Sequence, residues 1–526
     1  MDGAYLKRGE LELLGRKRIY TDVDDITPEN IFAVLEQALT IHEINMAEIL
    51  FLLEYEKGVQ ELVRKKEIRK EIDIKVSDNI ANQIVEFKLG YHYGYPITYT
   101  QRGDKDISGN NPSDDDKAVT QLNEMAEAEA TYAKDQEMAR FVEICGIAYE
   151  MVDVKRDFDG VSVFDLHVPH PLWTFDVYKN DIAETPMMGV TFRELQNGDR
   201  YFTCYTKDRL FEIQNLSRIV NGQKKSEWSF RGRSGEKNPL GLIPIVEFVR
   251  AYDRMGIFER HIADMNALNV EVSDFANATA QSCQEIWWGN DFEFPKNADG
   301  SNKTPKTGQW VMTKTLANGS KPLIQALSST FDFKSVQDNI EAKRNSILQK
   351  CFVPLQTDPS GGSTASALSL SSGWNAAEAA AMKEEQIVKA SKKKVLELEL
   401  AAVKVRSYWL DNSPIINLKA SDVTIKFTRQ KTYDLGTKTN AMVAMIKSGI
   451  NGRVAMQTVD LFADVAQAWA DSQETIEKLQ DSLFEKKEDI KVSEKRETAD
   501  LSDQTGNSPI LDGMNFGNGG DPNADS

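Results

Sequence analysis

The chain has 526 residues, which is too many for one ordinary hydrophobic core and predicts about two to four structural regions. Hydrophobic residues make up 41% and charged residues 27%, a balance that is typical of folded proteins and argues against a disordered or membrane-embedded chain. The net charge of −18 argues against a protein that grips nucleic acid by neutralising phosphates over a broad face, although an acidic protein can still surround DNA loosely.

The sequence gives no signal for membrane insertion or secretion. No apolar run approaches the roughly 18 residues that a bilayer-spanning helix needs. Residues 1–10 contain acids and no apolar core, which does not fit a secretory signal. The four cysteines lie too far apart for a zinc knuckle or a redox pair, so we expect reduced core residues of a cytoplasmic product at Cys145, Cys204, Cys283 and Cys351.

The first part of the chain is predicted to be mainly helical. Thr27-Pro28-Glu29 is typical of a helix start, because it supplies a capping residue, a proline and an acid in the first turn. Apolar residues then recur at helical spacing as far as Gly58. After a basic stretch at residues 64–70, the pattern predicts a second helix at residues 78–88 and a solvated loop at residues 103–116. An alanine- and glutamate-rich third helix is predicted at residues 117–144.

Strand patterns follow these helices. Apolar and aromatic runs bounded by turn residues predict strands at residues 148–154, 161–168, 172–178, 189–192, 201–205 and 243–249. Asn197-Gly198 and Asn221-Gly222 are typical of turns between them. Helices followed by meandering strands indicate an α+β region.

The middle of the chain predicts two slender helices separated by a small β-rich insert. In residues 253–284 the apolar stripe is narrow, with spacings of three and four, at Ile262, Met265, Leu268, Val272, Phe275 and Thr279. A narrow stripe suits a seam between neighbouring helices better than a wide core face. Residues 285–331 contain repeated turn residues and predict the insert, and residues 332–350 predict the return helix.

The last third of the chain begins with a loop. Two prolines and two glycines exclude regular structure from residues 353–363. An alanine-rich helix without proline is predicted for residues 364–410, with a kink at Gly373. A strand is predicted at residues 423–428 and further helices at residues 437–487. Residues 503–526 are predicted to be a disordered polar tail.

Sequence motifs of catalysis are missing. No glycine is followed by lysine, so there is no Walker-type phosphate loop. The segment Ser360-Gly361-Gly362-Ser363-Thr364 lacks the second glycine of a nucleophile elbow and is interpreted as a mobile loop. His167 and His170 have a strand-like context and no acidic partner at metal-site spacing, so both are interpreted as structural. We expect no catalytic, cofactor-binding or metal-binding residue.

Two basic clusters each have two possible interpretations. One is a solvated helix face, and the other is a contact with DNA or an acidic partner. The clusters comprise Arg64, Lys65, Lys66, Arg69 and Lys70, and Lys389, Lys392, Lys393, Lys394 and Arg406. Both clusters are interleaved with acids, which favours the solvated face. Asp114-Asp115-Asp116 is interpreted as a solvated loop, and Trp287 and Trp288 either as an exposed binding patch or as packing under the insert.

Four local phrases carry a family resemblance. They are Tyr55-Glu56-Lys57-Gly58; residues 76–99, in which a helix ends in Gly90-Tyr91 before Gly94 and Pro96-Ile97; Cys145-Gly146-Ile147-Ala148-Tyr149 with Pro169 and Val177-Tyr178; and residues 363–370 before the alanine-rich helix. In this order, and with the helix–insert–helix plan, they span most of residues 45–480 and resemble the portal proteins of long-tailed bacteriophages.

The resemblance implies an α+β, multi-region portal fold and a ring of copies, expected to be a dodecamer. The wing would comprise residues 1–252 and residues 364–436, the latter with the long kinked helix. The two stem helices would be residues 253–284 and 332–350, with the clip between them at residues 285–331. The tunnel loop would be residues 351–363, the crown residues 437–495 and the disordered tail residues 496–526.

The resemblance also implies contacts with DNA and with partner proteins, without enzymatic activity and without a cofactor or membrane. The tunnel loop would present Gln356, Thr357, Ser360, Gly361, Gly362 and Ser363 to double-stranded DNA. The clip would offer a docking surface with Trp287, Trp288, Lys303, Lys306 and Trp310. Expected partners are the terminase large subunit, the major capsid and scaffolding proteins, and a head-completion or adaptor protein, with assembly in the host cytoplasm and residence at the capsid portal vertex.

The acidic composition leads to a hypothesis about how such a ring would handle DNA. Negative charge on a channel wall keeps phosphates hydrated and unbound, while amide or cationic groups on the loop would brake the DNA. Deleting residues 360–363 and measuring packaged genome length tests the loop, because wild-type packaging and retention would exclude this role.

Two other classes of function stay open on the sequence. One is a metal-dependent nucleic-acid enzyme with an unrecognised site, which DNA cleavage on addition of a divalent metal would reveal. The other is a helical scaffold-type oligomer, and negative-stain images would separate it from a closed ring with a central hole.

Overall fold

The computed structural model describes residues 15–60, 73–101, 114–220, 223–282, 286–290, 297–301, 323–327, 332–355, 373–411, 413–429, 435–459, 468–469 and 472. The chain divides into two compact units, Met1–Thr432 and Tyr433–Ser526. The first unit combines helices with sheets that are mostly antiparallel, so the predicted α+β class is confirmed.

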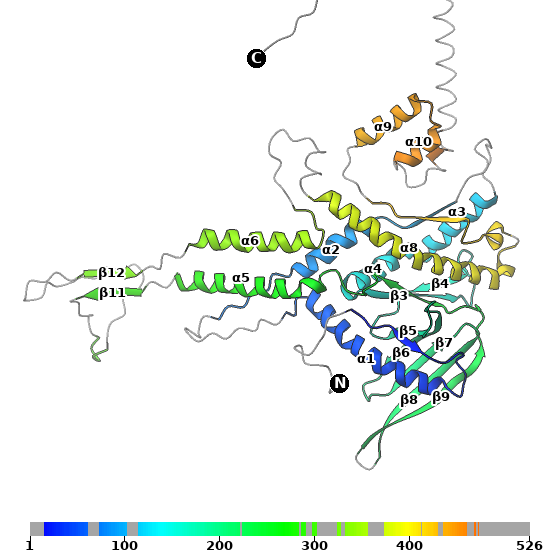
Figure 1. The fold of residues 1–526 in the computed structure, drawn as a ribbon, viewed down its shortest axis with the longest axis horizontal. Helices are drawn as coiled ribbons and strands as arrows, with labels where there is room; N and C mark the ends of the chain where they lie inside the picture. Colours follow the sequence, from blue (N-terminus) through cyan, green and yellow to red (C-terminus); the bar gives the residue numbers. More distant parts are fainter. Residues whose placement is uncertain are drawn as a thin grey trace, which may run out of the picture. The chain divides into compact units, whose positions relative to one another are not determined.

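A six-stranded sheet forms one layer of the first unit (Figure 1). Its order is β1-β5-β6-β7-β8-β9, in which β1 and β5 are parallel and the other neighbours are antiparallel. The strands are β1 (Ile19–Thr21), β5 (Thr174–Lys179), β6 (Pro186–Glu194), β7 (Arg200–Tyr205), β8 (Arg209–Val220) and β9 (Gln223–Lys237). Helix α1 (Ile31–Glu56) covers this sheet, because its Leu35 and the sheet residue Phe202 belong to one buried apolar cluster.

The sequence patterns did not predict β8 and β9, which have 12 and 15 residues. Most described side chains of β9 are half-buried or exposed, and its sequence is correspondingly rich in charged and polar residues. Such a strand lacks the apolar alternation on which the prediction relied. The predicted turn Asn221-Gly222 lies outside the described residues, between these two strands.

A second sheet and a long helix form the next layer. The sheet has the order β10-β3-β4 and consists of β3 (Ile147–Val154), β4 (Phe164–His167) and β10 (Ile245–Val249). Helices α4 (Thr131–Cys145) and α8 (Trp374–Val405) pack against it.

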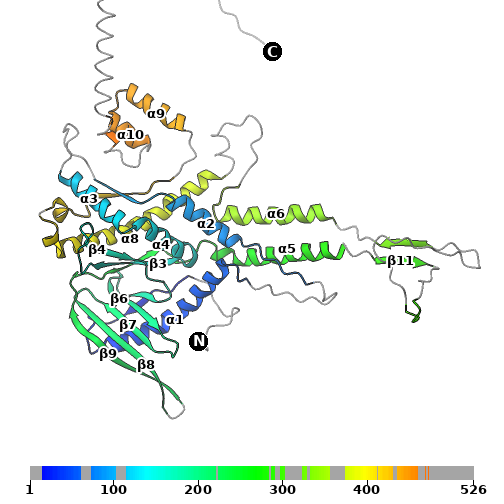
Figure 2. The ribbon, with the colours of Figure 1, turned by 180° about the vertical axis from the view of Figure 1, so that it is seen from behind.

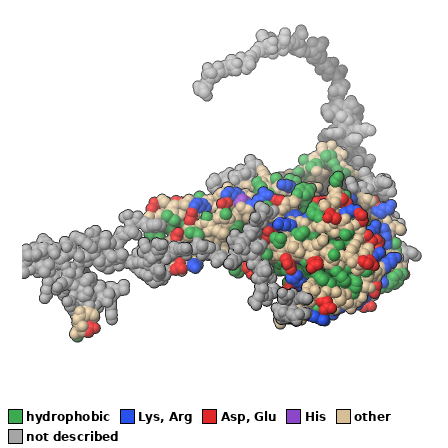
Figure 3. All heavy atoms as spheres, turned by 60° about the horizontal axis from the view of Figure 1, so that its bottom comes forward, with side chains coloured by type: hydrophobic (Ala, Val, Ile, Leu, Met, Phe, Trp, Pro, Cys, Tyr) green, Lys and Arg blue, Asp and Glu red, His purple; other side chains and the backbone are tan. Residues whose placement is uncertain are grey.

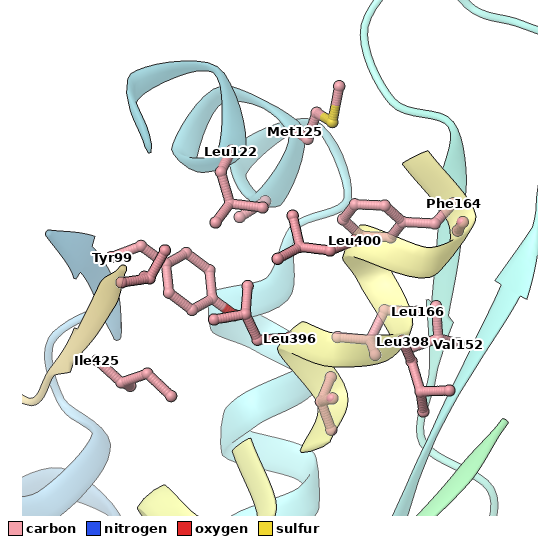
Figure 4. Packing of buried hydrophobic residues seen from close by; sticks show 14 of the residues in the cluster. Tyr99, Leu122, Met125, Val152, Phe164, Leu166, Leu396, Leu398, Leu400 and Ile425 are labelled. Carbon is pink, nitrogen blue, oxygen red and sulfur yellow. The ribbon is translucent and has the colours of Figure 1, made fainter. Parts of the chain in front are cut away.

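The other side of α8 is covered as well, by α3 (Asp114–Ala128) and by the ribbon of β2 (Thr98–Gln101) and β13 (Val423–Lys426). Figure 4 shows the consequence for the side chains of α8: Leu396 lies beside Tyr99, whereas Leu398 lies beside Val152 and Leu166. Helix α8 is therefore buried on two sides, which explains why its sequence is apolar beyond one stripe.

Helix α1 begins later than the sequence predicted. The residue at its N-cap position is Asn30, and Thr27 lies in the preceding turn. The Thr27 carbonyl accepts the N–H groups of Asn30 and Ile31 at 3.2 and 3.1 Å, while Asn30 Oδ1 accepts the N–H of Thr27 at 2.8 Å. Thr27-Pro28-Glu29 therefore forms a turn before the helix instead of its first turn.

The predicted helix at residues 117–144 is two helices, α3 and α4. Helix α3 begins at Asp114, so the three aspartates open a helix rather than a loop, in a position where negative charge is favourable. Between the helices Ala130 has φ 49° and ψ 44°, a left-handed conformation that ends α3. Neither glycine nor proline marks this break, so the pattern of residues could not reveal it.

Gly373 occupies the position just before helix α8, whereas the sequence predicted a kink there within a helix of residues 364–410; residues 364–372 of that prediction lie outside the described residues. Its φ of 87° is left-handed, a conformation that glycine adopts readily, and it occupies the N-cap position of α8. From Trp374 the helix continues for 32 residues.

Helices α5 (Ile262–Ser282) and α6 (Phe333–Lys350) lie side by side (Figures 1 and 2). Between them in the chain, β11 (Ile286–Asn290) and β12 (Leu323–Leu327) pair as an antiparallel hairpin. Asp332 caps α6 by accepting the N–H of Ser335 at 3.1 Å.

Helix α5 begins nine residues after the predicted position 253. A loop precedes it, because Arg254 is left-handed with φ 58° and its guanidinium donates to Glu247 at 2.7 Å. The same guanidinium donates to the carbonyl oxygen of Arg16 at 2.7 Å, so the loop is fixed by a contact with the start of the described chain.

The second unit contains α9 (Leu435–Lys447) and α10 (Gly452–Val459), which pack against each other. Both lie largely in the region predicted to be helical, residues 437–487. Most of that region beyond Val459, and the predicted disordered tail, lie outside the described residues.

Candidate functional site

A ladder of polar side chains on α5 holds an extended segment, residues 73–78, along the helix. The polar ladder consists of Asn269, Ser273 and Asn277, and the extended segment is called the strap. Asn277 accepts the N–H of Ile74 and donates to its carbonyl, both at 2.9 Å. Ser273 makes the same two bonds to Val76 at 3.0 and 3.1 Å, and Asn269 accepts the N–H of Asp78 at 2.9 Å.

The spacing of the polar ladder explains why it fits a strap. Four residues advance a helix by about 6 Å, and two residues advance an extended chain by roughly 6.6 Å. Side chains at every fourth helical position therefore meet every second residue of the strap. Because the strap is part of no sheet, the ladder replaces the strand that would otherwise satisfy its N–H and C=O groups.

Replacing Asn277 by alanine is expected to release the strap locally. The change removes both bonds to Ile74 and costs about 1–3 kcal/mol, because a partly buried N–H and C=O lose their partner. The amide of Ile74 should then exchange with deuterium at least about tenfold faster. The matched control is Thr279→Ala, an exposed position on the same helix, and equal exchange at Ile74 in both variants would contradict the role of the ladder.

The paired helices α5 and α6 leave much of their apolar stripe half-buried within one chain. At the inner end, Ile347 and Leu348 of α6 join a buried cluster with α1 and α2 (Ile80–Tyr93). Farther out the apolar residues are only partly covered, and this outer stripe consists of Val272, Phe275, Phe333, Val336 and Ile340. The rings of Phe275 and Phe333 meet edge-to-face there, with centroids 6.0 Å apart, and Lys343 forms a surface ion pair with Glu271. These are few contacts to hold two helices together within a single chain.

The lysine-rich cluster on α8 is not a solvated face at Lys392, contrary to the favoured interpretation. Lys392 is 3% exposed, and its Nζ donates to both carboxylate oxygens of Glu150 at 2.8 Å and to Asp135. Lys393 and Lys394 are exposed, so the interpretation holds for these two neighbours.

The buried carboxylates around Lys392 outnumber it, and their pKa values reflect this. We call Lys392, Asp135, Glu150 and Glu399 the lysine cluster. Burial raises the pKa of Glu399 to about 8 and that of Glu150 to about 7. Burial alone would lower the pKa of Lys392, but attraction to Asp135 and Glu150 outweighs it and the pKa is raised. The cluster joins α4, β3 and α8.

The structure describes only some of the predicted site residues. In the β11–β12 hairpin, Trp287 lies opposite Ala326 and Trp288 opposite Gln325. Their side chains lie outside the described part of the chain. The same holds entirely for the other predicted clip residues, the predicted tunnel-loop residues and the first basic cluster, namely Lys303, Lys306, Trp310, Gln356, Thr357, Ser360, Gly361, Gly362, Ser363 and residues 64–70.

The predicted histidines have structural surroundings. His167 is exposed on β4, and His170 packs its ring on Phe141 at 4.8 Å while its Nδ1 accepts the N–H of Leu172 at 3.1 Å. Sequence reasoning missed a different group, which lies at positions too far apart to form a motif: His92, Glu143 and Glu384. The described cysteines are buried and unpaired as predicted, namely Cys145, Cys204 and Cys351.

The described surface carries mixed charge. On the face drawn in Figure 3, basic and acidic side chains are interspersed among hydrophobic ones, without a continuous basic field of the kind that grips phosphates. Among the described helices, none is both long and apolar enough to cross a membrane.

Comparison with known families places the chain among structural, non-enzymatic proteins of the phage head. The model of the family described as phage portal protein, SPP1 Gp6-like, matches residues 37–491, so the chain belongs to this family. It is thus a head–tail connector protein of genome packaging, and the resemblance found in the sequence is confirmed. No curated protein matches the chain.

Proposed function

We propose that copies of this chain close into a ring, expected to be a dodecamer, at one vertex of the capsid, and that the ring is the conduit for packaging, retention and ejection of double-stranded DNA. The observation that supports this most directly is the outer stripe of α5 and α6. Its apolar residues are too exposed in one chain and too regularly placed for a solvated surface. Identical neighbours around a ring would cover them with a head-to-tail contact.

The regions are assigned in the family order. The stem would be residues 253–284 and 332–350, which contain the α5–α6 pair. The clip would be the insert at residues 285–331, which contains the β11–β12 hairpin and would dock the terminase large subunit and later the adaptor protein. Residues 351–363 would be the tunnel loop facing DNA. The layered body (residues 1–252 and 364–436) would be the wing, and residues 437–495 the crown, toward the capsid and scaffolding proteins.

Replacing Val336 by aspartate is expected to abolish most of the ring population. The wild-type chain should give closed rings with a central hole in negative-stain images and one large species by mass photometry. A charge in a buried stripe costs at least about 2 kcal/mol per contact, repeated at every interface of the ring, so the variant should remain as monomers or short arcs.

Ala342→Asp is the matched control, since Ala342 is exposed on the same helix. Normal rings from the Val336 variant would exclude the outer stripe as the contact. A wild-type chain that stays monomeric at every concentration and during capsid assembly would exclude the ring itself.

A further inference from the structure

A group of three metal-ligating side chains lies between α2, α4 and α8. His92, Glu143 and Glu384 each offer one ligand atom, and these atoms lie within 4.8 Å of one another. The residues are 6%, 3% and 9% exposed, so the group is inside the first unit. It has no part in the ring or in DNA passage as proposed above.

One polar atom of each residue in this group lacks a hydrogen-bond partner among the described residues, namely His92 Nε2, Glu143 Oε2 and Glu384 Oε2. Glu384 Oε2 does have charged neighbours, His92 Nδ1 at 3.4 Å and Lys88 Nζ at 3.7 Å. Buried polar groups are almost always paired, because an unpaired one loses its hydration without compensation.

The two carboxylates of the group are not paired alike. Among the described residues, Lys88 and Arg250 both form ion pairs with Glu384, at 3.7 and 3.0 Å, and Glu143 forms none. A buried carboxylate without a counter-charge costs free energy, and a bound cation would lower that cost.

We propose that His92, Glu143 and Glu384 bind one divalent cation of the Zn²⁺ type. One imidazole nitrogen and two carboxylate oxygens are ligands that Zn²⁺ accepts, whereas Mg²⁺ prefers an all-oxygen set and keeps several waters. Arg250 would orient the site from outside, because it donates to the other oxygen of Glu384 at 3.0 Å. The ion would cross-link three helices that are far apart in the chain.

Lys88 gives the proposal a sharp test. Its buried Nζ lies 3.7 Å from Glu384 Oε2, the oxygen that the cation would take. Its positive charge therefore competes with the ion. Lys88→Met should strengthen Zn²⁺ binding by at least about tenfold, since like charges a few ångströms apart repel strongly in a protein interior.

The experiment uses the full chain, treated with a chelator that is then removed, and equilibrium dialysis against Zn²⁺ in the presence of excess Mg²⁺. One Zn²⁺ per chain is expected in the wild type, none in His92→Gln and Glu143→Gln, and one in the control His170→Gln. Co²⁺ in place of Zn²⁺ should give visible d–d bands that His92→Gln removes. Circular dichroism establishes that each variant is folded.

Several outcomes overturn the site. They are a wild-type chain that retains no Zn²⁺, retention that is unchanged in His92→Gln, and an affinity that Lys88→Met leaves unchanged or weakens. The ring would be unaffected, since it depends on a different part of the chain.

Discussion

Replacing Lys392 by methionine is expected to lower the unfolding free energy of the first unit by about 3–5 kcal/mol near neutral pH. Methionine keeps the length of the side chain and its contact with the ring of Phe248, whose centroid lies 5.6 Å from the lysine Nζ. It removes the cation, so Asp135 and Glu150 are left buried beside each other without a counter-charge. Denaturant unfolding followed by circular dichroism measures the loss.

Lys393→Met is the matched control, because Lys393 is the next residue on the same helix and is exposed. Its effect should stay within about 0.5 kcal/mol, as for most surface substitutions. The loss in the Lys392 variant should also shrink as the pH falls and the carboxylates take up protons. Equal stability of the two variants would show that the buried ion pair does not stabilise the fold.

The second large effect is expected from Glu399→Gln, which should stabilise the first unit above neutral pH. The pKa of Glu399 is about 8 in the folded chain, against an ordinary value of 4.5. Between these two pH values the folded state holds a proton that the unfolded state has released. The unfolding free energy therefore falls as the pH rises through this range, by at most about 1.4 kcal/mol per pH unit for this group.

Glutamine resembles the protonated carboxyl and cannot ionise, so the variant loses this slope. At pH 8 its unfolding free energy should exceed that of the wild type by about 2–4 kcal/mol, and the difference should narrow toward pH 5. Because Glu150 titrates with a pKa of about 7, the range between pH 7 and 8 reports mainly on Glu399 within the lysine cluster. Glu397→Gln, an exposed change two residues away, should leave the pH profile unaltered. If the unfolding free energy of Glu399→Gln depended on pH in the same way as that of the wild type, Glu399 would not hold a proton in the folded chain.

These effects bear on the family's function through α8. The helix lies between the β10-β3-β4 sheet and the β2–β13 ribbon, and Gly373 at its start directly follows residues 356–372. We infer that the buried charges of α8 hold this part of the proposed wing in one register while neighbouring copies assemble. A variant with a weakened lysine cluster should therefore form fewer rings at raised temperature than its Lys393 control.

Much of the plan of the chain could be predicted from local patterns. The narrow stripes of α5 and α6, the turn-rich insert between them and the strands β3, β5 and β7 each express a periodicity of a few residues, which does not depend on distant partners. The family resemblance came from short phrases of the same local kind. Where the prediction failed, the local pattern carried no clear signal: no glycine or proline marks the break at Ala130, a glycine such as Gly373 fits a kink as well as a helix start, and β9 lacks apolar alternation.

By itself, the sequence determined that this is an acidic α+β protein with two slender helices around a small insert, because helical and strand periodicity are properties of neighbouring residues. Only the tertiary structure decided which charged residues are buried. Lys392 and Asp135 are 257 residues apart, and Lys392 has the same local surroundings as the exposed Lys393. The polar ladder, the lysine cluster and the His92 group likewise exist only where separate segments of the chain meet, since burial and pairing depend on position in space and not on order along the chain.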